Sequence, residues 1–327
     1  MATKNVIQAI HDTMWDEMKR DERVIVLGED VGAKGGVFKA TEGFLQEFGE
    51  LRVIDTPLAE LGIIGVAIGA ALNGMRPIAE IQFADFIHPA FDQIVNEAAK
   101  FYYRSNGAWN VPLVIRTPYG GGVHGGLYHS QSVEAFFAHV PGLKVVTPST
   151  PYDAAGLLRA AIRDPDPVLY LEHKKTYRAI RGEVPDEPFE IPIGLAEVRR
   201  EGTDLTVYAY GMMLHHTLEA AKIVAEEGID VEVVDLRTLH PLDRETILES
   251  AKKTGKVLIV HEDNRTMGLG AELAALIADE AFEWLDGPIH RVAGPDVPAM
   301  PYAEPMEEFF LPNPQKIAEG IRELAAY

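Results

Sequence analysis

The chain has no cysteine among its 327 residues. This absence excludes disulfide bonds, zinc–thiolate centres, iron–sulfur clusters and a cysteine nucleophile. Basic residues are also scarce, because 30 Lys and Arg stand against 50 Asp and Glu, which gives a net charge of −20. So negative a chain is repelled by nucleic acid and by anionic membranes, and we expect neither as a partner.

Long apolar runs are missing as well. The longest uncharged apolar run, Leu61 to Met75, is shorter than the roughly 20 residues that a membrane-spanning helix needs. It contains four glycines, which suit a buried helix packed closely against a neighbour. The segment Met1 to Arg20 lacks the apolar core of a signal peptide. We therefore expect a cytoplasmic protein.

The acidic residues are unevenly distributed. Residues 1–190 contain 18 basic and 25 acidic residues, a net charge of −7, whereas residues 191–327 contain 12 and 25, a net charge of −13. The C-terminal part is therefore a candidate docking surface for a basic partner. The alternative interpretation is that the charge serves solubility.

The length and pattern predict two α/β domains. Single hydrophobic cores stop growing at roughly 250–300 residues, so a chain of this length favours two of them. Short β-branched runs alternate with amphipathic stretches, including one over Pro89–Tyr102 that we expect to be a helix. A proline-rich, charged stretch interrupts the alternation. We expect a first domain over 1–180, a linker over 181–192 and a second domain over 193–327.

Glu60 is the first candidate for a chemical role. It ends the motif Asp55-Thr56-Pro57-Leu58-Ala59-Glu60 and stands directly before the apolar run. Burial in such a place disfavours the carboxylate charge, whereas a helix N-terminus favours it. The sequence leaves open whether Glu60 is a functional carboxylate or an ordinary residue of a first helical turn.

A glycine-dense loop over residues 119–132 carries the second candidates, His124 and His129. Each glycine adds an entropic cost, so stability does not account for the loop, and loops at strand ends carry ligands in α/β folds. The two histidines are poorly spaced for zinc and lack a nearby carboxylate ligand. We expect a catalytic histidine rather than a metal site.

Two other turns have alternative interpretations. The glycines of Gly28-Glu29-Asp30-Val31-Gly32 match neither the dinucleotide fingerprint nor the P-loop, so a flexible loop is favoured over a nucleotide site. Asp164 and Asp166 belong to an Asp-Pro-Asp-Pro turn, which is either structural or offers carbonyl oxygens to a hard cation.

These segments, in their order along the chain, resemble the beta subunit of thiamine-diphosphate-dependent 2-oxoacid dehydrogenases. The motifs are residues 27–32, 55–60, 80–86, 128–132, 148–154 and 234–238, so the resemblance covers the chain from end to end. Residues 82–86, 91–100 and 127–132 look most like the branched-chain enzyme. The resemblance implies two three-layer α/β/α domains: a pyrimidine-binding domain and a transketolase C-terminal-like domain.

The resemblance also implies roles for individual residues. The family glutamate that contacts the aminopyrimidine ring of thiamine diphosphate is matched by Glu60, and the pocket around that ring by Leu58, Gln82 and Phe86. His129 matches the histidine that acts in substrate binding and in reductive acylation of a lipoyl group. A structural potassium ion of the family is held largely by main-chain carbonyls, whose positions fall here on Val111, Leu113, Val114, Ala161, Asp164 and Asp166.

A missing motif points to a second polypeptide. The Gly-Asp-Gly motif and following Asn that bind magnesium and diphosphate in this family are absent, since Asp286-Gly287 lacks the leading glycine. The resemblance therefore implies an alpha subunit that holds magnesium and shares thiamine diphosphate in an α2β2 heterotetramer. It also implies a 2-oxo acid substrate and a lipoyl-bearing acyltransferase core, for which Asp296, Glu304 and the C-terminal carboxylate of Tyr327 are the expected docking residues.

Alternatives to the branched-chain assignment remain at this stage. The pyruvate and acetoin enzymes share the fold and the glutamate matched by Glu60. A non-catalytic acidic docking subunit for a multienzyme core is the alternative from a different class.

Overall fold

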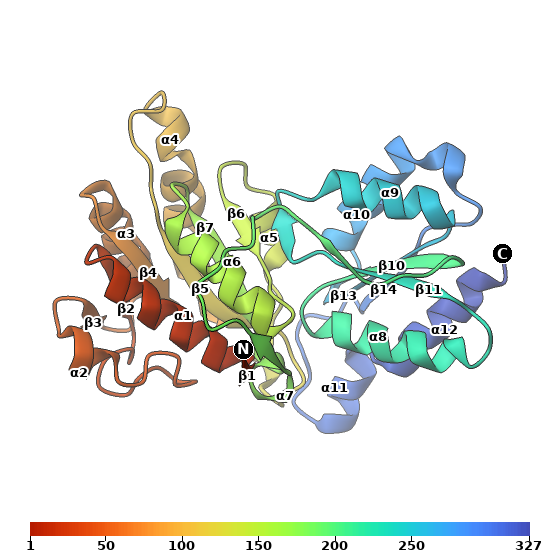
Figure 1. Ribbon diagram of the computed structural model, residues 1–327, viewed down its shortest axis with the longest axis horizontal. Coiled ribbons are helices and arrows are strands. Elements are labelled where there is room, and N and C mark those ends of the chain that lie inside the picture. The colour runs from red at the N-terminus through yellow and green to blue at the C-terminus, as the bar shows by residue number, and fades with distance from the viewer. The chain divides into compact units, whose positions relative to one another are not determined.

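The computed structural model describes all 327 residues, and these divide into two compact units. The first comprises residues 1–119 and 136–193, and the second residues 120–135 and 194–327. Each unit is a mostly parallel sheet flanked by helices (Figure 1). The α/β fold class predicted from the alternating pattern is confirmed.

The first unit is built on parallel strands. These are β2 (Val24–Gly28), β3 (Val53–Asp55), β4 (Arg76–Glu80), β5 (Val114–Tyr119), β6 (Lys144–Val146) and β7 (Val168–His173), in the order β6-β7-β5-β4-β2-β3. Successive side chains point to opposite faces of a strand, and both faces here are buried. This is why β2 is a continuous apolar run, Val24 to Leu27, rather than an alternation of apolar and polar residues.

Helices α1 (Val6–Arg20) and α6 (Pro151–Arg163) pack against each other and share one hydrophobic core with β2 and β7. Asn5 begins α1 with a capping box to Gln8, and Thr150 caps α6 through the Asp153 N–H. Helix α3 (Glu60–Leu72) packs against β4 through residues such as Ile64.

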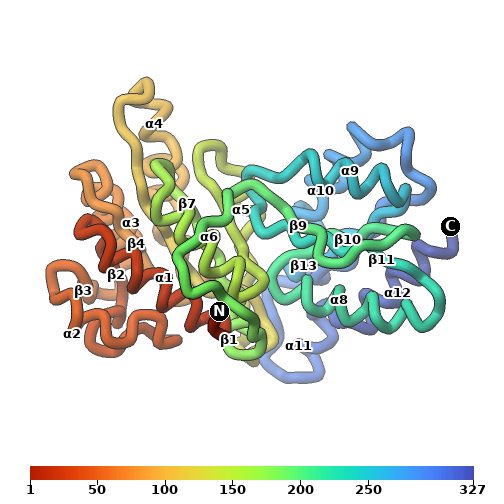
Figure 2. Tube along the Cα trace, viewed as in Figure 1, coloured from red at the N-terminus to blue at the C-terminus, as the bar shows by residue number.

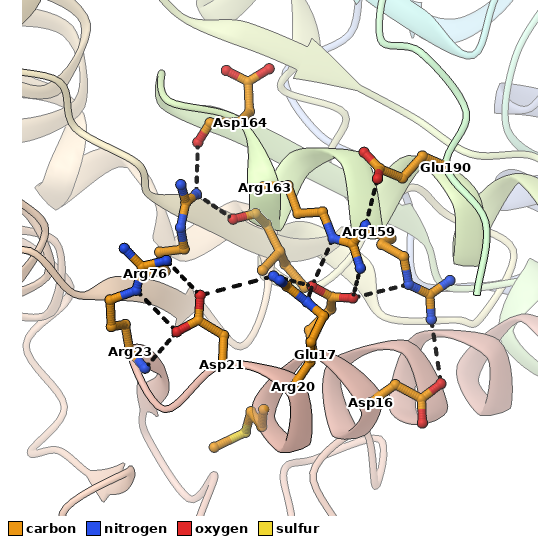
Figure 3. A network of polar contacts seen from close by, with 12 residues as sticks. Asp16, Glu17, Arg20, Asp21, Arg23, Arg76, Arg159, Arg163, Asp164 and Glu190 are labelled. Carbon is orange, nitrogen blue, oxygen red and sulfur yellow. Dashed lines mark hydrogen bonds and ion pairs between the residues drawn. The ribbon is translucent and has the colours of Figure 1, made fainter.

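A polar network joins α1 to α6 (Figure 3). The Glu17 carboxylate, only 1% exposed, accepts hydrogen bonds from Arg159 Nε at 3.1 Å and Arg163 Nη2 at 2.6 Å. Burial acts to raise the pKa of Glu17, but the hydrogen bonds and charges of Arg163 and Arg20 outweigh burial and hold it below its usual value. The network therefore keeps a buried carboxylate ionised between the two helices.

The expected linker, residues 181–192, lies against the first unit. Strand β8 (Arg181–Val184) pairs antiparallel with β1 (Ala2–Asn5), and the Phe189 ring stacks on Tyr152 with centroids 4.5 Å apart. The apolar side chains of this stretch pack against the core of the first unit. The prolines of the stretch, which lack N–H donors, do not prevent this packing. The glycine-dense loop, placed by the sequence boundaries in the first domain, groups with the second unit.

The segment expected as one helix over Pro89–Tyr102 consists of short pieces. They are η2 (His88–Ala90), η3 (Gln93–Glu97), η4 (Ala98–Lys100) and α4 (Phe101–Arg104), and they follow η1 (Ala84–Phe86). The helical spacing was correct, but the hydrogen-bond register alternates among 3-10, α and π types, which side-chain periodicity does not report. The other short helices are α2 (Phe44–Phe48), η5 (Gly126–Tyr128), α5 (Glu134–Ala138) and α7 (Thr176–Ala179).

The second unit has strand order β14-β13-β10-β11-β9. Its strands are β9 (Glu197–Arg200), β10 (Leu205–Ala209), β11 (Val231–Asp235), β13 (Val257–Asn264) and β14 (His290–Gly294), all parallel except β9; β12 is Thr238–His240. Helices α8 (Met212–Ala225) and α12 (Pro314–Ala325) lie side by side and share a core with these strands (Figure 2). The remaining helices are α9 (Arg244–Thr254), α10 (Leu269–Glu280), η6 (Phe282–Trp284) and α11 (Glu304–Phe310). None of the helices combines the length and apolar character required to cross a bilayer.

Candidate functional site

The candidate cofactor residues of the first unit follow the carboxyl ends of adjacent parallel strands. Gly28 on β2 is paired in register with Asp55 on β3 and with Glu80 on β4, so these three ends lie together. Glu60 follows β3, and Gln82 and Phe86 follow β4. In open α/β sheets this edge is where ligands bind.

The loop after β2 is fastened to the end of β3. The Asp55 carboxylate accepts hydrogen bonds from the Gly32 N–H at 2.6 Å and the Ala33 N–H at 3.2 Å. A Cβ atom on Gly32 would lie 2.6 Å from Asp55 Oδ2, so the position requires glycine. Gly32 thus serves a close contact between the backbone of this loop and the Asp55 carboxylate, which holds the loop that the sequence predicted to be flexible.

Glu60 is half-buried in the first turn of α3. Its carboxylate has no hydrogen-bond or ion-pair partner within the chain, and the helix N-terminus favours its negative charge. The neighbouring Glu29 senses that charge, because burial first and then the charges of Asp30 and Glu60 raise the pKa of Glu29. An uncompensated carboxylate therefore stands at the carboxyl edge of the sheet.

The other residues of the expected pyrimidine pocket surround this edge. Gln82 is half-buried and its Nε2 donates to the Glu29 carbonyl at 3.3 Å. The Phe86 ring meets Phe83 edge-on with centroids 5.7 Å apart, and Leu58 is 72% exposed. The first unit thus presents an apolar side chain, an aromatic ring, an amide and a free carboxylate.

The glycine-dense loop belongs to the second unit. The Gly120 N–H donates to the Gln131 carbonyl at 3.0 Å, which closes residues 120–131 into a compact loop with neighbouring ends. His129 follows η5 and is exposed, as is His124. The structure therefore places His129 in one unit and Glu60 in the other.

Two buried carboxylates of the second unit hold this loop. Glu262 on β13 accepts a hydrogen bond from the Gly121 N–H. Glu307 on α11 accepts from the Gly122 N–H at 2.9 Å and the His124 N–H at 3.3 Å. Glu262 lies 141 positions along the chain from Gly121, and Glu307 lies 185 positions from Gly122. No local motif in the sequence signalled them.

The expected potassium ligands lie around the start of β5 and the end of α6. The carbonyls of Val111, Leu113 and Ala161 each accept one backbone hydrogen bond. Lys144 Nζ lies 2.7 Å from the Asp164 carboxylate and 3.3 Å from that of Asp166, and Arg76 Nη1 donates to the Asp164 carbonyl at 3.2 Å. The positive charges of Lys144 and Arg76 thus neutralise the turn. Val114, another of the expected ligands, is the first residue of β5.

The expected docking residues lie on the second unit. Asp296 accepts hydrogen bonds from the Thr266 N–H at 3.0 Å and Oγ1 at 2.6 Å, and these bonds lower its pKa. Glu304 is exposed at the beginning of α11, and Tyr327 is 70% exposed with its ring near His290. All three are accessible on this chain.

Comparison with known proteins identifies the class. Residues 2–179 match the family "Transketolase, pyrimidine binding domain", and residues 194–317 match "Transketolase, C-terminal domain". A solved split-gene transketolase, described as an inactive beta4 tetramer, aligns with a TM-score of 0.80 and 25% identity over 99% of this chain and 98% of that one. The fold is therefore the transketolase-like two-domain α/β fold.

Curated relatives narrow the class to a family. The chain is 60% identical to the 2-oxoisovalerate dehydrogenase subunit beta of Bacillus subtilis over 327 residues, 100% of both chains. It is 50% identical to the pyruvate dehydrogenase E1 component subunit beta of the same organism, again over 100% of both. The chain belongs to the thiamine-diphosphate-dependent family of 2-oxoacid dehydrogenase beta subunits. The resemblance inferred from the motifs is confirmed.

Proposed function

We propose that this chain is the beta subunit of a branched-chain 2-oxoacid dehydrogenase, which decarboxylates 2-oxoisovalerate and related acids and acylates a lipoyl group. The observation that carries the proposal is the identity of 60% to the 2-oxoisovalerate subunit against 50% to the pyruvate subunit, both over the full length. A pyruvate dehydrogenase beta subunit is the alternative.

The residues at the carboxyl edge of the first sheet fit the pyrimidine end of thiamine diphosphate. Glu60 offers a carboxylate without a partner, and the hydroxyl of the neighbouring Thr56 is buried without a hydrogen bond. Leu58 and Phe86 offer apolar and aromatic surface to a flat ring. When bound, thiamine diphosphate supplies the electron sink for decarboxylation of a 2-oxo acid.

The chain's own residues have separate tasks in this proposal. Glu60 holds a proton at the ring nitrogen of the pyrimidine, and exclusion of water by Leu58 and Phe86 strengthens that hydrogen bond. Gln82 orients the ring from the end of β4. His129 acts at the acyl-transfer stage, where the lipoyl S–S bond breaks, one sulfur takes the acyl group and the other takes a proton; imidazole is suited to deliver that proton.

A partner alpha subunit completes the site in this proposal and holds magnesium. The missing Gly-Asp-Gly motif supports this, because the diphosphate end needs a magnesium site from another chain. The exposed face of α3 supports assembly as well, because Leu61 is 52% and Val66 63% exposed. Gly62 and Gly69 are likewise open, since no other helix or strand lies within 4 Å of the position that a Cβ atom would take there. We propose an α2β2 heterotetramer that docks a lipoyl-bearing acyltransferase core.

We also propose a potassium ion at Val111, Leu113, Val114, Ala161, Asp164 and Asp166. Each carbonyl oxygen has two lone pairs, so one hydrogen bond leaves room for a cation. A bound ion has to coexist with Lys144 and Arg76. Replacing NaCl by KCl at constant ionic strength should raise the melting temperature of the complex, and equal melting temperatures would refute the site.

Steady-state turnover tests the main proposal. The chain is reconstituted with its alpha subunit, and kcat/KM is compared for 2-oxoisovalerate, pyruvate and acetoin. We expect the branched-chain acid to be preferred by at least about tenfold, since one pocket methylene is worth 10–200-fold. A preference for pyruvate would reassign the chain to the alternative.

A further inference from the structure

The loop over residues 120–131 is intrinsically costly to order. Its backbone takes left-handed angles at Gly120 (φ 84°), Gly122 (φ 77°), Gly126 (φ 63°) and, without the freedom of glycine, His124 (φ 56°). Residues of this kind have many alternative conformations in a free loop. The loop therefore needs contacts from outside to present His129 in one place.

Glu307 supplies three such contacts. Its Oε1 accepts the Gly122 and His124 N–H groups at 2.9 and 3.3 Å, and its Oε2 lies 2.6 Å from His124 Nδ1. Closely spaced N–H groups of this kind form a concave anion-binding nest. Here the anion is the protein's own carboxylate, from a helix far along the chain.

The carboxylate and the loop depend on each other. The Glu307 residue is only 2% exposed, and a buried carboxylate is costly unless hydrogen bonds satisfy it. The N–H groups of the loop satisfy it, and it in turn fixes their direction. Charge-assisted hydrogen bonds of this type are roughly twice as strong as neutral ones.

The segment before α11 is fitted to the same loop. A Cβ on Gly121 would lie 2.7 Å from Met300 Cε, and a Cβ on Gly126 would lie 3.2 Å from Tyr302 Cδ2. Glycine is therefore required at Gly126, whose φ is also positive, whereas a side chain at Gly121 would have to displace the end of the Met300 side chain. The contact runs from Gly121 to Gly126, up to three residues before His129.

We propose that Glu307 is a positioning residue for His129, holding the loop so that the imidazole is correctly placed for acyl transfer to the lipoyl group. This inference rests on the proposed function. Glu307 lies in the second unit together with the loop, and its contacts fix backbone N–H groups rather than the cofactor residues of the first unit. Loss of Glu307 should therefore impair acyl transfer more than decarboxylation.

The experiment separates these two half-reactions in the reconstituted complex. Decarboxylation of 2-oxoisovalerate is followed with a soluble dye as electron acceptor, and acyl transfer with the free lipoyl domain of the acyltransferase. In Glu307→Ala at saturating 2-oxoisovalerate, where weaker substrate binding does not limit the rate, we expect the dye rate to stay within about 2-fold and the lipoyl rate to fall at least about tenfold, since misplacement by 1 Å can cost about 10²-fold. Glu307→Gln should largely restore the lipoyl rate, because its amide oxygen still accepts both N–H groups.

Controls and a direct structural readout complete the design. Glu308→Ala, at the exposed next position of α11, should change neither rate. Hydrogen exchange of peptides covering residues 120–131 should be faster in Glu307→Ala than in the control. If Glu307→Ala does not assemble, Glu307→Asp, which withdraws the carboxylate by one carbon, replaces it in both measurements with the same expected direction.

The outcomes distinguish the inference from the proposed function. An equal fall of both rates, or unchanged rates and exchange, would overturn the positioning role of Glu307. Absence of decarboxylation by the unmodified complex with either acceptor would instead overturn the proposed function.

Discussion

Arg116 and Glu172 face each other across strands β5 and β7 as a two-pronged ion pair. Arg116 Nε and Nη2 donate to the two Glu172 oxygens at 2.8 and 2.7 Å, and the residues are 1% and 0% exposed. Arg116 also pairs with Glu80 at the end of β4, where burial raises the pKa of the Glu80 carboxyl. Because Glu80 is paired in register with Gly28 and stands two residues before Gln82, this cluster reaches the same carboxyl edge of the sheet as the candidate cofactor residues.

Removing one charge from this cluster should destabilise the chain strongly. Glu172→Gln leaves Arg116 paired with Glu80 but weakens its two-pronged contact, and losing a hydrogen-bond partner of a buried group costs about 1–3 kcal/mol. We expect a loss of this size in the free energy of unfolding, measured by urea denaturation. Glu183→Gln, exposed on β8, is the matched control and should change stability by less than about 0.5 kcal/mol. A loss as small as that of the control would show that the pair is dispensable.

Glu60→Gln should abolish most catalysis without disturbing assembly. The substitution keeps the shape of the side chain but removes the carboxylate that the proposal assigns to the pyrimidine ring, and proton-transfer groups contribute about 10²–10⁴-fold to rates. Decarboxylation by the reconstituted complex should fall at least about a hundredfold, while co-purification with the alpha subunit is unchanged. Glu50→Gln, at an exposed position, serves as the control. Near wild-type turnover in Glu60→Gln would favour the non-catalytic docking subunit.

Glu134 should make the second unit less stable as the pH rises. It is fully buried, Tyr210 Oη donates to its Oε1 at 2.7 Å, and its Oε2 has no partner. Burial first, and then the charge of Asp263, raise the pKa of Glu134 from 4.5 to about 8. The folded chain therefore binds a proton that the unfolded chain releases above pH 4.5, so stability falls through the window from 4.5 to about 8.

Glu134→Gln should remove this dependence, because a neutral amide mimics the protonated acid. The melting temperature of Glu134→Gln minus that of the unmodified chain should increase from pH 5.5 through pH 7 to pH 8.5. Because Asp263, whose pKa burial raises to about 6, interacts electrostatically with Glu134, the comparison is made in an Asp263→Asn background, where Asp263 does not titrate. A difference that stays constant with pH would show that Glu134 is not protonated in the folded chain.

Local sequence patterns predicted the strand ends, the helix and the loop of the candidate site, but not the distant residues that hold the loop in place. A β-branched run predicted the strand that ends near Asp55, and the apolar stretch after Glu60 predicted the helix that begins there. The glycine-dense loop was found because so many glycines have no structural benefit of their own. Glu307 was missed, since its partner Gly122 lies 185 positions away and only the folded chain brings them together. Likewise, the apolar run after Glu60 predicted a buried helix packed against a neighbour, whereas Leu61 and Val66 are exposed in this chain, because an apolar run does not distinguish a core helix from a helix with one exposed face.

Binding of the acyltransferase core should depend steeply on salt if the acidic C-terminal unit is its docking surface. The net charge of −13 over residues 191–327 attracts a basic domain at long range, and salt screens that attraction. Affinity measured by calorimetry should fall at least about tenfold between roughly 50 and 500 mM NaCl. Glu304→Gln should weaken binding about 2- to 3-fold at low salt and little at high salt, as exposed charge pairs contribute about 0.2–1 kcal/mol. Glu283→Gln, an exposed acid on η6, is the matched control. An affinity that does not change with salt would mean that the excess acidity serves solubility and that the core binds through other contacts.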